Sequence, residues 1–213
     1  MKVVCISDTH GMEAKVPDGD VLIHAGDLTI YGKPKEFERV GTWLRSLPHP
    51  VKIIIAGNHD IGLDPTRVSI EDRLTNQIAL TGYDQDVYYL DDVGLFVDGL
   101  FVYGSPWQPE FHDWAFNLPR GDALRRVWQG IPDGLDILIT HGPPAGILDE
   151  ARGVHVGCED LRAIVELRQP KLHVFGHIHE GYRLMKTEHT TYVNASICNF
   201  LYDPVNAPIV VDL

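Results

Sequence analysis

The chain has 213 residues, of which 44% are hydrophobic, and 18 Lys and Arg residues stand against 30 Asp and Glu residues for a formal net charge of -12. This length and composition favour one globular domain over residues 1–213 and exclude disordered and collagen-like chains. The acidic balance repels polyanions and excludes a long nucleic acid as partner. No apolar run approaches the roughly 18 residues of a membrane span, and no basic region with an apolar block follows Met1, so we expect no membrane association and no signal peptide.

Three cysteines stand far apart in the chain, at Cys5, Cys158 and Cys198, and none belongs to a C-x-x-C pair. An odd number of scattered cysteines is typical of reduced thiols, which predicts a cytoplasmic protein. A nucleophilic or metal-binding cysteine is the less favoured alternative, because free cysteine usually behaves as a small buried hydrophobic residue.

Short runs rich in Val, Ile and Leu alternate with helical patterns. The continuous hydrophobicity of these runs indicates strands buried on both faces, and the alternation indicates an α/β fold around a central sheet. The predicted strands are residues 2–7, 20–25, 51–56, 100–103, 135–140 and 171–175, and the predicted helices are residues 34–47, 122–129 and 158–168.

Three further stretches follow other patterns. Residues 78–103 and 182–213 contain short strand-like runs separated by turn residues, which predicts antiparallel pairing. Residues 104–121 contain Trp107, Phe111, Trp114 and Phe116 without any period. This segment is long for a loop, so it is either functional or an aromatic-rich cover of the sheet edge, and both interpretations stay open.

Polar side chains follow five of the predicted strands, at the point where each strand ends. In α/β sheets, ligands bind beyond the carboxyl ends of the strands, so these side chains are expected to converge on one site. They are Asp8 and His10, then Asp27, then Asn58, His59 and Asp60, then His141, then His177 and His179.

The residue types at these strand ends indicate a metal centre. Carboxylates, an amide oxygen and neutral imidazoles are ligands for Mn, Fe, Zn or similar ions, and there are too many here for one tetrahedral ion. Two divalent ions about 3.5 to 4 Å apart can share them if one carboxylate bridges. Each motif alone is also an ordinary turn, but five in order favour the metal centre.

The remaining histidines and one arginine are expected to be structural. Among His24, His49, His112, His155, His173 and His189, the strongest candidates for supporting the ligands are His24 and His112. Arg120 could bind a phosphate oxygen, but an ion pair with a carboxylate is favoured.

The ordered blocks resemble those of the calcineurin-like metallophosphoesterases. The family's D-x-H, G-D, G-N-H-D/E, later H and G-H-x-H blocks have counterparts in Asp8-Thr9-His10, Gly26-Asp27, Gly57-Asn58-His59-Asp60, His141 and Gly176-His177-Ile178-His179. The chain as a whole is similar to the small metallophosphoesterase-domain-containing (MPPED-like) subgroup. That similarity includes the Trp107 loop, residues 117–121, Thr140-His141-Gly142-Pro143-Pro144 and His179-Glu180-Gly181-Tyr182.

This resemblance implies a four-layer sandwich of two mixed β-sheets flanked by α-helices, with a dinuclear site at the sheet edge. It assigns Asp8, His10, Asp27 and His179 to a first metal and Asp27, Asn58, His141 and His177 to a second, with Asp27 as the bridge. It also implies that His59 contacts the phosphate and protonates the leaving oxygen.

One position departs from the pattern of the superfamily's protein Ser/Thr phosphatases. They carry an Asp three residues after the bridging Asp, paired with the catalytic His, where this chain has Ile30. This disfavours a protein phosphatase, and Asp60 is the alternative partner expected for His59.

The resemblance implies hydrolysis of small phosphodiesters, with cyclic nucleotides as one class, by attack of a metal-bridging hydroxide. A phosphomonoesterase is less favoured, and a nuclease is disfavoured by the acidic charge. The alternative from another class is a weakly active or non-catalytic metal-bearing interaction module on the same fold. The combination of His59 with all seven ligands favours the enzyme, because a binding module has no need of it.

Overall fold

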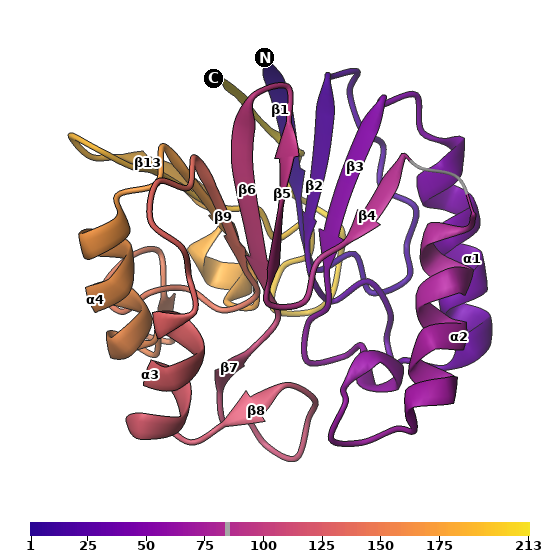
Figure 1. The fold of residues 1–213 in the computed structure, drawn as a ribbon, viewed down its shortest axis with the longest axis horizontal. Coiled ribbons are helices and arrows are strands. Elements are labelled where there is room, and N and C mark those ends of the chain that lie inside the picture. Colours follow the sequence, from indigo (N-terminus) through magenta and orange to yellow (C-terminus); the bar gives the residue numbers. More distant parts are fainter. Residues whose placement is uncertain (84–85) are drawn as a thin grey trace.

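The computed structural model describes residues 1–83 and 86–213, and it contains two mixed β-sheets with helices on their outer sides (Figure 1). The first sheet has the strand order β15-β1-β2-β3-β4. Strands β1 to β4 are parallel, and β15 pairs with β1 in antiparallel orientation. Their bounds are β1 Lys2–Ile6, β2 Val21–Ala25, β3 Val51–Ile55, β4 Val87–Tyr89 and β15 Ile209–Asp212.

The second sheet has the order β13-β14-β12-β9-β6-β5, with four parallel inner strands and an antiparallel strand at each edge. Its bounds are β5 Val93–Val97, β6 Leu100–Ser105, β9 Ile137–Thr140, β12 Leu172–Phe175, β13 Arg183–Lys186 and β14 Thr191–Asn194. Two separate pairs of short strands lie outside these sheets. β7 Gln108–Pro109 pairs with β8 Asn117–Leu118, and β10 Glu150–Ala151 pairs with β11 Val154–His155.

In the described part of the chain, four helices form the two outer layers, namely α1 Pro34–Ser46, α2 Ile70–Thr81, α3 Asp122–Gln129 and α4 Glu159–Arg168. Single turns of 3-10 helix span Ile61–Leu63 (η1) and His179–Gly181 (η2). In Figure 1, α1 and α2 lie beside the first sheet, and α3 and α4 lie on the other side of the molecule.

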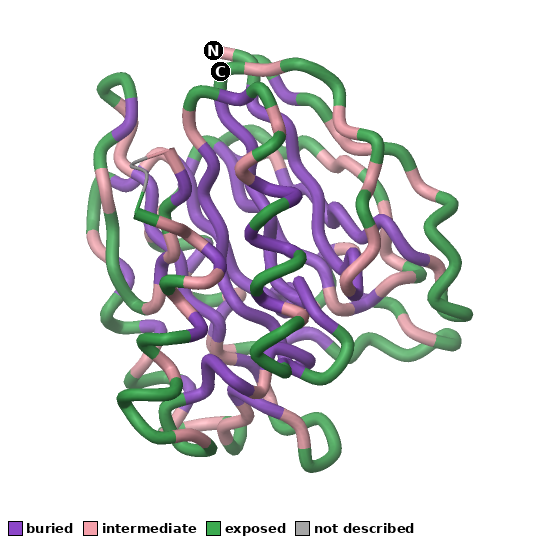
Figure 2. The backbone as a smooth tube through the Cα atoms, turned by 90° about the vertical axis from the view of Figure 1, so that its right-hand side faces the viewer, coloured by how far each residue is buried: buried purple, intermediate pink, exposed green. Residues whose placement is uncertain are grey.

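Three hydrophobic clusters account for the layering. One lies between the sheets and includes Ile55 and Ile139. Another joins Leu22 of the first sheet to Phe37 of α1, and the third joins the second sheet to Trp128 of α3. Figure 2 shows the strands buried inside and exposed residues along the loops and the outer helix faces. The four-layer fold implied by the resemblance is therefore confirmed.

The predicted strands and helices lie within a few residues of the observed ones, but helix α2 was not predicted. Residues 78–81, expected to begin a stretch of short strands, form its last turn. Both ends of α2 carry common helix signals. At the start, the Ser69 hydroxyl accepts a hydrogen bond from the Asp72 amide at 3.1 Å, and at the end Gly82 has φ +70°.

The expected antiparallel pairing of the two turn-rich stretches is partly wrong. Pairs β5-β6, β13-β14 and β15-β1 are antiparallel, whereas β4 and β14 each pair in parallel with the preceding buried strand of their sheet. Both parallel strands are reached by long crossings of the chain, which a local sequence pattern does not reveal. Residues 84 and 85 of the first stretch lie outside the described residues.

Parallel pairing brings the carboxyl ends of the strands to one end of the sandwich, opposite the two chain termini (Figure 1). There Ser7, just after β1, bridges to Ser196, just after β14, so the two sheets meet. The three cysteines are free and buried, as expected. Among the described residues, no helix is long and apolar enough to cross a membrane.

Candidate metal centre

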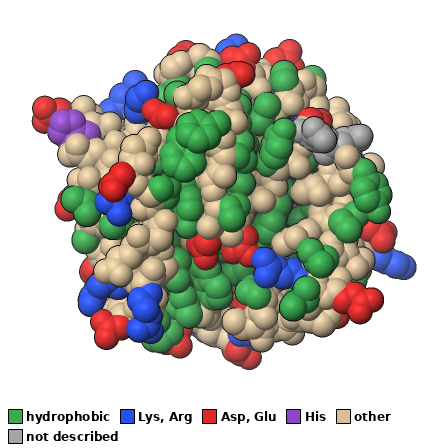
Figure 3. Space-filling view, in the orientation of Figure 1, with side chains coloured by type: hydrophobic (Ala, Val, Ile, Leu, Met, Phe, Trp, Pro, Cys, Tyr) green, Lys and Arg blue, Asp and Glu red, His purple; other side chains and the backbone are tan. Residues whose placement is uncertain are grey.

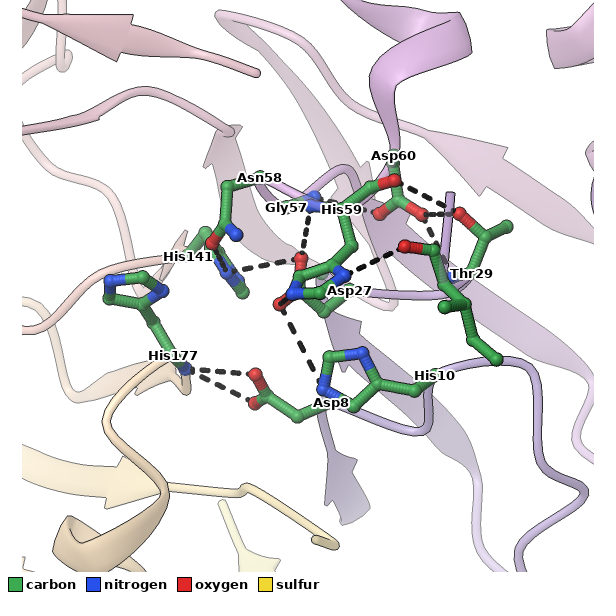
Figure 4. Close-up of polar contacts among 12 residues, drawn as sticks. Asp8, His10, Asp27, Thr29, Gly57, Asn58, His59, Asp60, His141 and His177 are labelled. Atoms are coloured by element: carbon green, nitrogen blue, oxygen red, sulfur yellow. Dashed lines mark hydrogen bonds and ion pairs between the residues drawn. The ribbon is translucent and has the colours of Figure 1, made fainter. Parts of the chain in front are cut away.

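The structure brings the predicted ligand side chains together where the two sheets meet, and Figure 4 labels all of them except His179. Three groups of residues can each be recognised in which the candidate ligand atoms lie within 4.8 Å of one another. The groups are Asp8, His10 and His179; His10, Asp27 and His59; and Asp27, His141 and His177. The Asn58 side-chain oxygen is 3.0 Å from Nε2 of His141. All seven residues named from the sequence therefore face one site.

Asp27 lies between the two halves of this site. Its Oδ1 is 3.4 Å from Nε2 of His141, and its Oδ2 is 4.0 Å from Nε2 of His10. Gly57 makes this arrangement possible, because a Cβ at that position would collide with Oδ1 of Asp27. A carboxylate with one oxygen toward each half has the geometry of a bridging ligand.

The backbone around the ligands adopts an unusual conformation. Asp8, His10, Asp27 and His177 have φ of +53°, +45°, +54° and +64°, a region that residues other than glycine seldom adopt. Hydrogen bonds hold it: the Asp8 amide donates to the Gly26 carbonyl at 3.0 Å, and the His177 amide donates to both Asp8 carboxylate oxygens at 3.1 Å. Such strain is concentrated at functional sites, where the surrounding structure compensates for it.

Backbone carbonyls orient two of the imidazoles. Nδ1 of His141 lies 2.9 Å from the Ala25 carbonyl, and Nδ1 of His179 lies 2.8 Å from the Asn199 carbonyl. A carbonyl can only accept, so each Nδ1 carries the hydrogen, and Nε2 of each ring faces the site. When the ring is neutral, this tautomer leaves the Nε2 lone pair free to bind a metal.

The donor set fits divalent cations. Asp8 and Asp27 are almost completely buried, and across residues 1–83 and 86–213 neither forms an ion pair with Lys or Arg. Burial opposes ionisation, yet the histidines around them, His179 beside Asp8 and His141 beside Asp27, hold the pKa of both carboxyls below the ordinary value. Two buried negative charges need positive charge beside them, which protonated His141 and His179 provide in the metal-free chain and bound cations would provide in their place.

His59 is held differently from the expectation. Its Nδ1 donates to the Ile30 carbonyl at 2.8 Å, its Nε2 lies 4.0 Å from Oδ2 of Asp27, and its ring packs 4.2 Å from that of Trp114. The expected pairing with Asp60 is wrong, because the Asp60 carboxylate points away and accepts from four donors. These donors are the amides of Leu28, Thr29 and Gly57 and the Thr29 hydroxyl.

Tyr202 is a site residue that sequence reasoning missed. Its ring centroid lies 4.7 Å from that of His10 and 5.3 Å from that of His179, and its φ is +65°. Nothing near Tyr202 in the sequence signals this position, because the C-terminal loop reaches the site only through the tertiary fold.

The segment 104–121 packs against its surroundings and also lines a cavity at the site. Its Ala115 amide donates to the Asn58 carbonyl at 3.1 Å, and Trp107 packs against Phe116. Its residues Phe111 and His112 line a cavity of about 360 Å³ over the metal ligands, which we call the metal-site cavity. The lining also includes Asp27, Asn58, His59, Ala151, Arg152, His177, Ile178, His179, Glu180, Phe200 and Tyr202.

His24 and Arg120, for which the sequence predicted structural or supporting roles, make contacts that bear on those predictions. His24 lies behind the ligands, with Nε2 2.9 Å from the Thr9 hydroxyl between Asp8 and His10. Arg120 pairs with Glu159 at 2.6 Å and donates to two backbone carbonyls, so the ion pair favoured from the sequence is confirmed.

The fold and the site together define a metallophosphoesterase, and comparison with known proteins agrees. Residues 1–181 match the family model described as calcineurin-like phosphoesterase. The chain therefore belongs to the calcineurin-like phosphoesterase family, whose members are metal-dependent hydrolases acting on phosphoesters.

Several individual proteins are also similar to this chain in sequence or in fold. Metallophosphoesterase domain-containing protein 1 of Homo sapiens is 48% identical over 100% of this chain and 71% of its own length. A probable cyclic nucleotide phosphodiesterase of Synechococcus is 31% identical over 76% of this chain and 59% of its own. The crystal structure of TT1561 of Thermus thermophilus has the same fold, with a TM-score of 0.63 at 15% identity, covering 91% of this chain and 88% of that one.

Proposed function

We propose that this chain is a phosphodiesterase for small substrates, cyclic nucleotides among them, with two divalent ions bound by the seven strand-end ligands. The observation that carries the proposal is the position of Asp27, with one carboxylate oxygen toward His10 and the other toward His141. Asp8, His10 and His179 complete one set of ligands, and Asn58, His141 and His177 complete the other.

When bound, two divalent ions supply Lewis acidity that activates a water molecule and neutralises phosphate charge. The chain's own contribution begins with His59, whose Nδ1 is held by the Ile30 carbonyl so that Nε2 faces the metal-site cavity. A protonated His59 gives its Nε2 proton to the leaving alkoxide, and Tyr202 covers His10 and His179 and limits the access of bulk water.

Three further properties belong to the proposal, namely a single domain, a small substrate and a cytoplasmic location. The hydrophobic cluster shared by both sheets supports a single domain over residues 1–213. Lys and Arg side chains are scattered among acidic ones on the face shown in Figure 3, and the net charge is -12, which supports a small substrate over a long nucleic acid. Three free, buried cysteines support a cytoplasmic location.

A substrate panel tests this function. The purified full chain, stripped of metal and then given Mn²⁺, is assayed with bis(p-nitrophenyl) phosphate, p-nitrophenyl phosphate and 2′,3′-cyclic AMP. We expect metal-dependent turnover that favours the diesters. Tight binding of two ions without hydrolysis of any ester would favour the alternative, a metal-bearing interaction module.

A further inference from the structure

A second cavity adjoins the metal-site cavity. It has a volume of about 270 Å³, and Phe111, Ala151, His177 and Ile178 line both cavities. We call it the apolar cavity, because most of its other side chains are also apolar, namely Pro109, Pro143 and Val156. The phosphate-binding end of the site thus continues past His177 into a space suited to an apolar group.

The polar groups of the apolar cavity offer little to a polar ligand. Arg120 lines it, but its guanidinium already donates to the carbonyls of Val156 and Gly157, each at 2.7 Å, and pairs with Glu159 at 2.6 Å. The other charged side chain, Glu110, is exposed and would repel an anion. A cavity of this kind selects by shape and apolar contact.

The position of the apolar cavity relative to His59 decides which part of a substrate it can take. His59 lies 4.0 Å from Oδ2 of Asp27, whereas His177 belongs to the group on the Oδ1 side with His141 (Figure 4). A phosphodiester whose leaving oxygen lies at His59 directs its other ester group away from it, and the cavity that begins at His177 is there to receive that group.

We propose that the apolar cavity binds the retained alcohol group of a phosphodiester substrate, and that this group is compact and apolar. The inference rests on the proposed phosphodiesterase function. An aryl or alkyl alcohol has this chemistry. A nucleoside base carries polar edge groups, for which the cavity offers little, because the Arg120 guanidinium is already engaged by Val156, Gly157 and Glu159.

A series of p-nitrophenyl phosphodiesters tests the proposal, because the leaving group stays fixed while the retained group varies. The Mn²⁺-loaded full chain is assayed with methyl, pentyl, phenyl and thymidine 5′ esters. We expect kcat/KM for the phenyl ester to exceed that for the methyl ester on the order of tenfold or more, since each fully buried methylene contributes about fourfold. The gain should lie mainly in KM, because the same contacts exist before and during the reaction.

Two matched variants locate the effect. Val156→Trp fills the apolar cavity and should abolish the preference for phenyl over methyl. Val154→Trp places the same side chain on the same hairpin, but Val154 is 60% exposed and lines neither cavity, so the preference should persist. Val156→Ala enlarges the cavity and should shift the preference toward a naphthyl ester, which keeps the test valid if Val156→Trp misfolds.

The outcomes separate this inference from the function on which it rests. If none of the esters is hydrolysed, the proposed function fails. If all are hydrolysed with equal kcat/KM, or if Val156→Trp and Val154→Trp alter the preference equally, the apolar cavity inference alone is overturned. A thymidine ester preferred over the phenyl ester, and losing that preference in Val156→Trp, would keep the cavity as the binding site of the retained group but overturn the statement that this group is compact and apolar.

Discussion

His59 donates its Nδ1 hydrogen to the backbone carbonyl of Ile30 at 2.8 Å. This position is the one at which the chain departs from the superfamily's protein Ser/Thr phosphatases, which carry an Asp there whose side chain pairs with the catalytic His. Here the main chain provides the acceptor, so the histidine is oriented without a carboxylate, and Nε2 faces the metal-site cavity.

The first prediction follows from this orientation. His59→Ala should keep both metal ions and lose about 10² to 10⁴ in turnover on diesters with alkyl leaving groups, the range for a positioned general acid. The loss should shrink with p-nitrophenolate, which leaves without a proton. His189→Ala, which removes an exposed histidine elsewhere, is the control. An equal loss across leaving groups would mean that His59 binds phosphate and transfers no proton.

The second prediction concerns the bridging position. Metal analysis of the purified chain should find two divalent ions, and chelation should abolish hydrolysis until Mn²⁺ is restored. Asp27→Ala should release more metal than Asp8→Ala, because Asp27 has an oxygen toward each half of the site. Asp18→Ala, which removes an exposed carboxylate, should release none. Equal single-ion losses from Asp27→Ala and Asp8→Ala would remove the bridging assignment.

The sequence predicted the site better than its surroundings, for a physical reason. Ligands such as Asp8 and His177 directly follow buried strands, so strand periodicity places them, and parallel pairing brings them together. Tyr202 and the Ile30 carbonyl reach the site through loops whose course depends on tertiary contacts. Helix α2 did carry local signals, Ser69 before it and Gly82 after it, but the strand-like run at its end obscured them.

The third prediction concerns Asp60, whose carboxylate ties the loop after β2 to the loop after β3. Asp60→Ala would leave three buried amides without their acceptor, so the free energy of unfolding should fall on the order of 3 kcal/mol. Thr29→Val removes one of the four donors and also the acceptor of the Gly32 amide at 3.0 Å, and should cost about 1 to 2 kcal/mol. Urea unfolding of the metal-free variants measures both, and similar values for the two would show that Asp60 does not join the loops.

The fourth prediction concerns pH. Burial alone would lower the pKa of His141 and His179, but Asp27 beside His141 and Asp8 beside His179 raise both to about 9 in the metal-free chain. Because a metal ligand must be neutral, metal binding releases these protons, and Mn²⁺ affinity should rise between pH 6 and 9. Calorimetry in buffers of different ionisation enthalpy counts the protons, and an affinity independent of pH would contradict the prediction.

The same pKa values predict the opposite trend for the metal-free fold. A histidine whose pKa is raised by folding stabilises the native state while it is charged in that state. This contribution is complete below the unfolded pKa of about 6.5 and is lost as pH rises through about 9. Unfolding midpoints of the metal-free chain should therefore fall above pH 7, whereas those of the Mn²⁺-loaded chain should not follow that fall.

The last prediction tests whether the second metal is needed for turnover, and it rests on His177. His177→Gly removes one imidazole from the proposed second set of ligands, Asp27, Asn58, His141 and His177, and leaves the other set complete. The change suits the backbone, because His177 has φ +64°, which glycine adopts freely. The amide of residue 177 can still donate to Asp8, so the fold should persist and the loss should be specific to metal binding.

Occupancy of the second metal site should fall in His177→Gly. The effect should appear in kcat more than in KM, because two metal ions together stabilise the entering and leaving oxygens mainly in the transition state. Excess Mn²⁺ should recover part of the rate by mass action, since Asp27, Asn58 and His141 remain. Metal titration with parallel kinetics checks both. A His177→Gly protein with two tightly bound ions and wild-type kcat would remove His177 from the ligands and weaken the assignment of the whole second set.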